Sequence, residues 1–155
     1  MRKTLTVAMV ALAALAGGCK PKEMTSRAIN TMTADGLEVS IELPKRDFRS
    51  GESFNVIVTA RNVSDGPLAI EASSAAPVWL RLHRHGAIGY DEIRRYPESA
   101  AMVLNTWALA PKQVRTFTYR LTVEPDWPRH ELLHLTAEVN GRASAAPGIA
   151  ITILP

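Results

Sequence analysis

The amino-acid sequence predicts an all-β protein built from two packed antiparallel sheets with about seven or eight strands. Apolar and polar residues alternate in short segments from Leu37 to the C-terminus, which is the period of strands with one buried face. No segment in this region keeps helical spacing for three turns, and turn-forming residues recur at intervals of roughly 8–12 residues. A sandwich is therefore the favoured architecture, with a closed barrel as the second choice.

Residues 1–18 have the organisation of a secretory signal. Arg2 and Lys3 precede an apolar run from Leu5 to Ala16, and two glycines follow it. A basic start, an apolar stretch of about 7–15 residues and an exit of small residues are typical of a signal peptide. The run is shorter than the about 20 residues of a transmembrane helix. We therefore expect a helical signal peptide over residues 1–18.

The only cysteine of the chain, Cys19, directly follows this signal. Residues 15–19 (LAGGC) resemble the lipobox of bacterial lipoproteins, although Ala16 stands where a bulky aliphatic residue is usual. The resemblance implies cleavage before Cys19, attachment of diacylglycerol to its sulfur, and acylation of its amine by a fatty acid such as palmitate. Because Lys20 rather than an aspartate comes next, it also implies an outer-membrane anchor facing the periplasm. The alternative is an ordinary cleavable signal with an incidental cysteine.

The residues after Cys19 are polar and carry no useful periodicity up to Gly36. We therefore expect residues 19–36 to be a lipid-anchored tether, and residues 37–155 to be one folded domain. The full chain has a formal net charge of +3, which falls to +1 when Arg2 and Lys3 leave with the signal. Since the longest basic cluster is Arg94 with Arg95, nucleic acid is not an expected partner.

Within the domain, the alternation predicts eight strands, at residues 37–43, 54–61, 68–70, 78–83, 101–109, 116–123, 133–139 and 148–154. The clearest pattern is that of residues 116–123, where aromatic and aliphatic side chains alternate with threonines and an arginine. Residues 86–99 show the least regular pattern, and residues 124–130, with two prolines, predict a loop.

Two segments carry a further resemblance, residues 53–71 (SFNVIVTARNVSDGPLAIE) and residues 109–123 (LAPKQVRTFTYRLTV). They resemble bacterial immunoglobulin-like sandwich domains, and in particular the BsuPI-type proteinase-inhibitor domain. The chain has Lys112 and Gln113 where that family prefers Gly-Glu, and the strand that follows lacks a tryptophan. The resemblance implies an immunoglobulin-like β-sandwich and, as an alternative function, proteinase inhibition.

The polar residues form none of the common catalytic motifs and no complete metal-ligand set. The chain contains no Gly-x-Ser-x-Gly elbow, no phosphate-binding glycine loop and no carboxylate pair at fixed spacing. His83 and His85 would share one face of a strand and could share a metal, but only Asp91 and Glu92 are near them in sequence. We therefore expect solvent-facing histidines, no cofactor, no metal and no enzymatic activity.

Because we expect neither catalysis nor metal binding, recognition of a protein partner is the remaining class of function. Residues 90–97 interleave Tyr90 and Tyr96 with Arg94 and Arg95, the residue types that are enriched in interface hot spots. Trp127 is a second candidate, in the predicted loop 124–130. Equally, the tyrosines could pack onto the sandwich while the arginines are merely solvated. The sequence thus predicts a lipid-anchored, non-enzymatic protein-binding or assembly module of the cell envelope, with a BsuPI-like inhibitor as the alternative.

Overall fold

The computed structural model describes residues 26–155, so the predicted signal helix and Cys19 lie outside the described residues. This part of the chain contains no helix that is long and apolar enough to cross a membrane. Its strands are β1 Ala28–Ala34, β2 Leu37–Leu43, β3 Asp47–Arg49, β4 Ser53–Asn62, β5 Leu68–Ala72, β6 Val78–His85, β7 Tyr90–Tyr96, β8 Asn105–Leu109, β9 Val114–Thr122, β10 Leu132–Val139 and β11 Gly148–Leu154.

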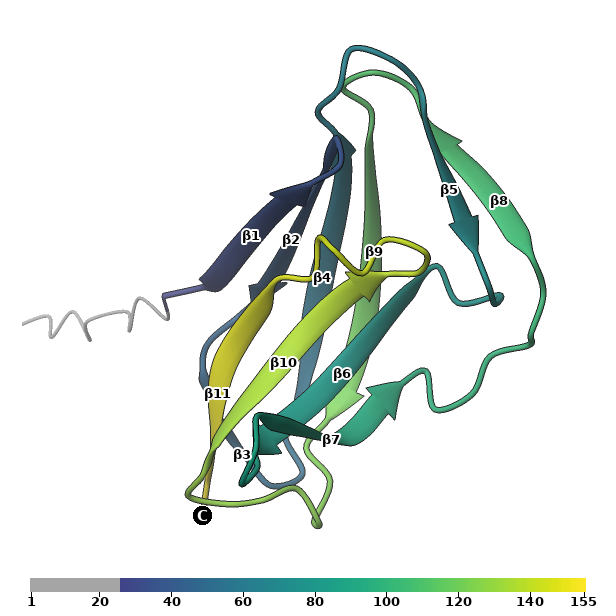
Figure 1. The fold of residues 1–155 in the computed structure, drawn as a ribbon. Helices are drawn as coiled ribbons and strands as arrows, with labels where there is room; N and C mark the ends of the chain where they lie inside the picture. Colours follow the sequence, from purple (N-terminus) through teal and green to yellow (C-terminus); the bar gives the residue numbers. More distant parts are fainter. Residues whose placement is uncertain (1–25) are drawn as a thin grey trace, which may run out of the picture.

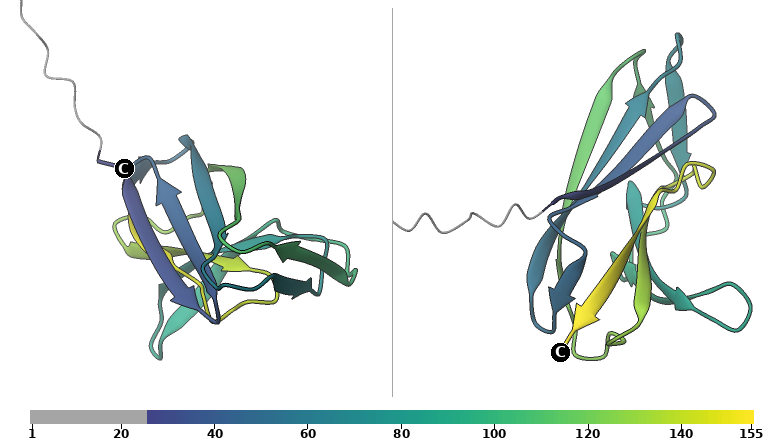
Figure 2. Two further views of the ribbon diagram at one scale, coloured as in Figure 1. Left: turned by 90° about the horizontal axis from the view of Figure 1, so that it is seen from above. Right: turned by 90° about the vertical axis from the view of Figure 1, so that its left-hand side faces the viewer.

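The strands form two facing layers and a small projecting ribbon (Figures 1 and 2). The four-stranded sheet has the order β1-β2-β4-β9, and the five-stranded sheet has the order β3-β11-β10-β6-β7. Strands β5 and β8 pair only with each other and form a separate ribbon, the arm, on the side of the molecule away from β1 (Figure 1). The prediction of an all-β sandwich is confirmed.

The core lies between the two sheets and is made by the alternation that the sequence shows. In β2 every second side chain is fully buried, from Leu37 to Leu43. Strand β10 does the same from the opposite sheet, with Leu133 and Leu135 at 0% exposure. Each such large aliphatic side chain stabilises the fold by about 1.5–3 kcal/mol relative to an exposed position.

The prediction of a tether that extends to Gly36 is wrong for residues 28–34. These residues form β1, which pairs antiparallel with β2 from Ala28↔Leu43 to Ala34↔Leu37. Only Ala28 of this strand is buried. Because β1 lies at the edge of its sheet and is held by backbone pairing, its side chains carry no alternation that a sequence pattern could reveal.

Three further expectations need correction. Residues 90–96, expected to be irregular, form β7 at the edge of the five-stranded sheet. The strand expected at residues 101–109 is confined to β8, Asn105–Leu109. The short β3 pairs parallel with β11, so the second sheet is not purely antiparallel. This pairing arises because the chain crosses from one sheet to the other after Leu43, and the amide of Thr152 donates to the carbonyl of Arg46.

Two buried asparagines attach the arm to the sandwich at the two ends of β5. Asn62 donates to the carbonyls of Gly66 (2.8 Å) and Leu109 (3.0 Å), so it joins the end of β4 to both strands of the arm. Asn140 donates to Ser74 Oγ (2.8 Å) and to the carbonyl of Ala76 (2.9 Å) at the other end. These hydrogen bonds fix the arm in place without a strand ladder between it and either sheet.

Candidate functional site

Strand β7 carries four of the candidate binding residues and sends them to two different faces. Tyr96 and Arg94 lie opposite Leu80 and Leu82, whose side chains are buried, and therefore point toward the inner side of the sheet. Tyr90 and Arg95 lie opposite residues of the outer face. The structure thus separates residues that the sequence suggested as one recognition segment.

On the inner side, Arg94 and Tyr96 meet Trp127 and two carboxylates of the loop between β9 and β10. Arg94 forms ion pairs with Glu124 and Asp126. The Tyr96 hydroxyl donates to Glu124 at 3.4 Å, and its ring lies 6.4 Å from that of Trp127. Trp127 is only 2% exposed. This group, the latch, closes one end of the sandwich, so its residues hold the fold rather than form a free surface.

The electrostatics of the latch fit this structural role. Burial, with a further contribution from the Glu124 carboxylate, raises the pKa of Tyr96 to about 12, so its hydroxyl stays protonated and remains a donor. The carboxylate of Asp126 raises the pKa of Arg94, and Glu124 adds to this effect. The Arg94 guanidinium is thus engaged by two carboxylates of its own chain, with both ion pairs partly exposed.

Arg95 belongs to a network of charged side chains on the outer face of the five-stranded sheet. It donates to Glu92 (2.9 Å), which also pairs with Arg81 at 3.2 Å. Arg81 reaches Glu138 at 3.1 Å, and Arg95 lies 5.6 Å from the ring of Trp79. Ion pairs at a surface of this kind contribute about 0–1 kcal/mol each. The network indicates a solvated sheet face, with Arg95 engaged by its neighbours.

Tyr90 lies in a cluster with three histidines of β6 and β10. Its ring stacks on His85 at 4.7 Å and meets His134 edge-on at 4.8 Å. His83 lies directly opposite His134, and its Nε2 is 3.2 Å from Thr136 Oγ1. Desolvation lowers the pKa of both His83 and His134; the Glu92 carboxylate opposes this at His83, and repulsion from His85 adds to it at His134, so both groups favour the neutral imidazole. It lines a pocket of about 180 Å³.

The histidines do not form a recognisable metal centre. Within residues 26–155, no group of three or more His, Cys, Asp or Glu side chains has the spacing of a metal site. His85 and His134 are 6.4 Å apart between ring centroids, and Tyr90 contacts both. The cluster is a surface of aromatic and imidazole rings in contact with one another.

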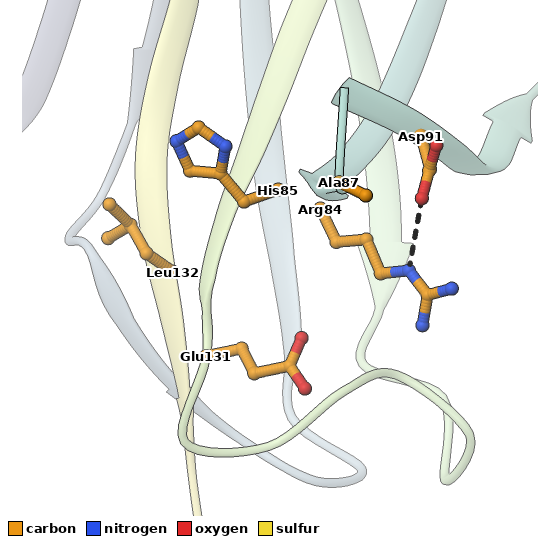
Figure 3. Close-up of a pocket in the computed structure, with 7 residues that line it drawn as sticks. Arg84, His85, Ala87, Asp91, Glu131 and Leu132 are labelled. Carbon is orange, nitrogen blue, oxygen red and sulfur yellow. Dashed lines mark ion pairs between the residues drawn. The ribbon is translucent and has the colours of Figure 1, made fainter. Parts of the chain in front are cut away.

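Beside this cluster, a larger pocket of about 510 Å³ opens at the hairpin between β6 and β7 (Figure 3). Arg84 and Asp91 form an ion pair of 3.7 Å in it, and the carboxylate of Glu131 also lies in the pocket. The carboxylate of Asp91 lies against Gly86, where it would be 2.7 Å from a Cβ, so a side chain at position 86 would displace this carboxylate. The wall opposite the ion pair is formed by Leu132.

Three exposed apolar side chains lie at the same end of the five-stranded sheet as this pocket, and one of them, Leu132, lines it. Ile88, at the tip of the hairpin, is 96% exposed, and Tyr90 and Leu132 are 54% and 53% exposed. We call these three residues, together with the pocket, the hairpin end. Sequence reasoning identified only Tyr90 among them. The available signal was the segment 86–89, in which Ile88 sits next to a glycine at the centre of a turn.

A second exposed apolar segment lies in the connection from β7 to β8. Met102 and Leu104 are 83% and 88% exposed, and Val103 between them is 52% exposed. The sequence had placed these residues in a strand. They lead into β8, whose Trp107 packs against Phe117 of β9. Sequence analysis did not single them out.

Comparison with known proteins gives information about the fold alone. No protein-family model matches the chain, and no curated protein matches it. Among solved structures, the sporulation control protein Spo0M from Bacillus subtilis is similar over 79% of this chain and 51% of its own, with 13% identity and a TM-score of 0.54. A β-glucosidase from Listeria innocua in complex with gluconolactone matches over 84% of this chain and 16% of its own, with 16% identity and a TM-score of 0.45.

The chain therefore spans about half the length of Spo0M and a small fraction of the β-glucosidase. At such identities, the similarity to Spo0M supports the all-β fold and carries no information about activity.

Proposed function

We propose that this chain is a lipid-anchored, non-enzymatic protein-binding module of a bacterial envelope, and that it binds its partner through the hairpin end. The observation that carries the proposal is Ile88, a β-branched aliphatic residue at 96% exposure on the tip of a hairpin. Tyr90 and Leu132, each about half exposed, add apolar surface at the same end of the five-stranded sheet, and Arg84, Asp91 and Glu131 add charged groups there. Exposed apolar side chains set among charged ones are typical of protein interfaces.

The alternative, inhibition of a proteinase, finds less support in the arrangement of β7. An inhibitory loop has to present an extended, accessible segment to the cleft of the enzyme. Residues 90–96 instead pair with β6, and Arg94 is held by Glu124 and Asp126. We therefore favour binding through the hairpin end.

The lipid anchor is the other part of the proposal. Eight residues, 20–27, separate Cys19 from Ala28, the first residue of β1. Fully extended, this segment spans at most about 30 Å. The sandwich would accordingly stay close to the bilayer, nearer than a tether reaching Gly36 would allow.

The variant Cys19→Ser is expected to lose lipid labelling and membrane retention, because the hydroxyl cannot form the thioether to diacylglycerol. Labelling with a radioactive fatty acid and fractionation of the cells would measure both properties. Folding should be unaffected, because Cys19 precedes β1, and the urea midpoint provides that control. Lipid labelling that persists in Cys19→Ser would refute the anchor.

The variant Ile88→Asp is expected to weaken partner binding at least about tenfold, because it places a charge among the apolar side chains of the interface. Crosslinking in the native envelope, followed by mass spectrometry, identifies the partner, and the yield of that same crosslink is then compared between variants. The matched control is Leu104→Asp, an equally exposed site in the connection between β7 and β8. Equal yields for the unmodified chain and Ile88→Asp would exclude the hairpin end.

A further inference from the structure

The two sheets have four outer edges, formed by β1, β9, β3 and β7, and three of them are protected against pairing with another chain. Strand β3 is only three residues long. Strand β7 is bulged opposite Leu82 and His83, and four of its residues are charged. On β1, Asn30 accepts the amide hydrogen of Thr31 and donates to the carbonyl of Gly148 at 2.7 Å, which ties this edge to β11.

Strand β9 is less protected, because it is neither short nor bulged, only two of its nine residues are charged, and the hydrogen bond from the Tyr119 hydroxyl to the carbonyl of Val78 in the opposite sheet is 3.4 Å long. It is nine residues long, and its register with β4 runs without a shift from Ser53↔Thr122 to Arg61↔Val114. It contains no proline, glycine or lysine, and no strand of the described chain pairs with its other side. Alternate residues of such a strand direct their backbone N–H and C=O groups outward, ready to pair with an added strand.

The side chains that β9 directs into the sandwich are also incompletely covered. Phe117 and Tyr119 are only partly buried, whereas their partners on β4, Val58 and Val56, are fully buried. The arm reaches this edge only through side chains, with the ring of Trp107 6.0 Å from that of Phe117. Part of the apolar surface of the core is thus exposed to solvent along β9, and one more strand paired with β9 would cover it.

The charge on β9 indicates what kind of strand would fit. Arg120 is on the outer face, exposed, opposite Asn55, and forms no ion pair with a residue of the described chain. Arg115 lies over Trp107 and Phe117, at 4.9 Å and 5.3 Å from their rings. A second copy of β9 would add two more arginines to the same edge. A strand with a carboxylate opposite Arg120 would instead complete an ion pair.

We propose that β9 receives an extended, acidic segment of a partner protein by strand addition. Backbone hydrogen bonds to β9 supply affinity, apolar side chains of the segment cover Phe117 and Tyr119, and an Asp or Glu pairs with Arg120. The proposal rests on the proposed function in one respect, that the partner is a protein. It adds a second contact surface, distinct from the hairpin end, and states the chemistry of what binds there.

The test uses the full-length chain in detergent and a fluorescent peptide as long as β9, nine residues. In this probe valine at the even positions alternates with threonine at the odd ones, and aspartate takes the third position, which lies opposite Arg120 when the peptide pairs antiparallel along the whole of β9; a twin peptide carries lysine there. We expect the aspartate peptide to bind more tightly than its twin, and Arg120→Glu to reverse the preference by about tenfold in the ratio of the two dissociation constants. Arg129→Glu, an exposed arginine in a loop, is the control and should keep the original preference.

Amide hydrogen exchange locates the bound peptide. Protection of β9 amides that appears only with the aspartate peptide supports the proposal. Absence of binding, or protection of β1 or β7 instead, overturns it. Concentration-dependent protection of β9 without peptide would assign the edge to a second copy and would also overturn it. Because Ile88→Asp leaves β9 intact, loss of the envelope crosslink in that variant combined with a negative peptide result would retain the proposed function and reject this inference.

Discussion

Replacement of Trp127 by alanine is expected to lower the free energy of unfolding by about 3–5 kcal/mol, the usual cost of truncating a large buried aromatic residue. Trp127 is 2% exposed and packs beside Tyr96 in the latch, where Arg94 holds the same loop through Glu124 and Asp126. Its removal leaves a cavity at the end of the core that the surrounding loop can fill only in part. Urea denaturation, followed by circular dichroism, measures the loss.

Two further variants separate this structural role from the binding role that the sequence suggested. Trp127→Phe keeps most of the apolar volume and should recover much of the lost stability. Tyr90→Ala, at a half-exposed site of the hairpin end, should cost less than about 1 kcal/mol and instead reduce the envelope crosslink. A Trp127→Ala protein with unchanged stability and a lost crosslink would show that Trp127 belongs to the interface after all.

The strands that the sequence predicted best are those that bury one face on the core. Residues 37–43 and 148–154 were predicted with the bounds that the structure has, because every second side chain there is apolar and buried. At the end of β10, the φ of 84° at Gly141 explains why a glycine follows Asn140. In these segments, the residues that the alternation predicts to face the core are the residues that the fold buries.

The strands that the sequence missed depend on partners that no local pattern reveals. In β1 every side chain except that of Ala28 is exposed or half-buried. The strand is therefore held by its backbone hydrogen bonds to β2 and not by burial of its side chains. In β7 a charged residue, Arg94, points inward, which breaks the expected alternation. Its charge is tolerated there because Glu124 and Asp126, distant in sequence, are adjacent in space.

The candidate site residues also depend on contacts that are distant in sequence. The composition of residues 90–97 suggested one recognition segment, but composition could not tell which of its side chains face the core. The fold sends Arg94 and Tyr96 into the latch and leaves Tyr90 on the hairpin end. Ile88 was overlooked because a single aliphatic residue in a turn has no periodicity.

The variant Asn62→Ala is expected to lower the free energy of unfolding by about 2–4 kcal/mol. The fully buried amide of Asn62 donates to the carbonyls of Gly66 and Leu109, and its Oδ1 accepts from the amide and the hydroxyl of Ser64 at 2.9 Å and 2.6 Å. Alanine can replace none of these four contacts, and the carbonyl of the buried Leu109 loses its side-chain donor at a site closed to water. Since Leu109 ends β8, the arm loses its buried hydrogen bond to the end of β4.

Asn55→Ala is the matched control, because Asn55 lies on the same strand, is exposed, and should change stability by no more than about 0.5 kcal/mol. Ser64→Ala removes only the hydroxyl contacts and should cost about 1 kcal/mol. Trp107 reports on the arm, so Asn62→Ala should alter its fluorescence before global unfolding, whereas Asn55→Ala should not. A loss below about 0.5 kcal/mol in Asn62→Ala would mean that the arm is held by the packing of Trp107 on Phe117 and not by the buried amide.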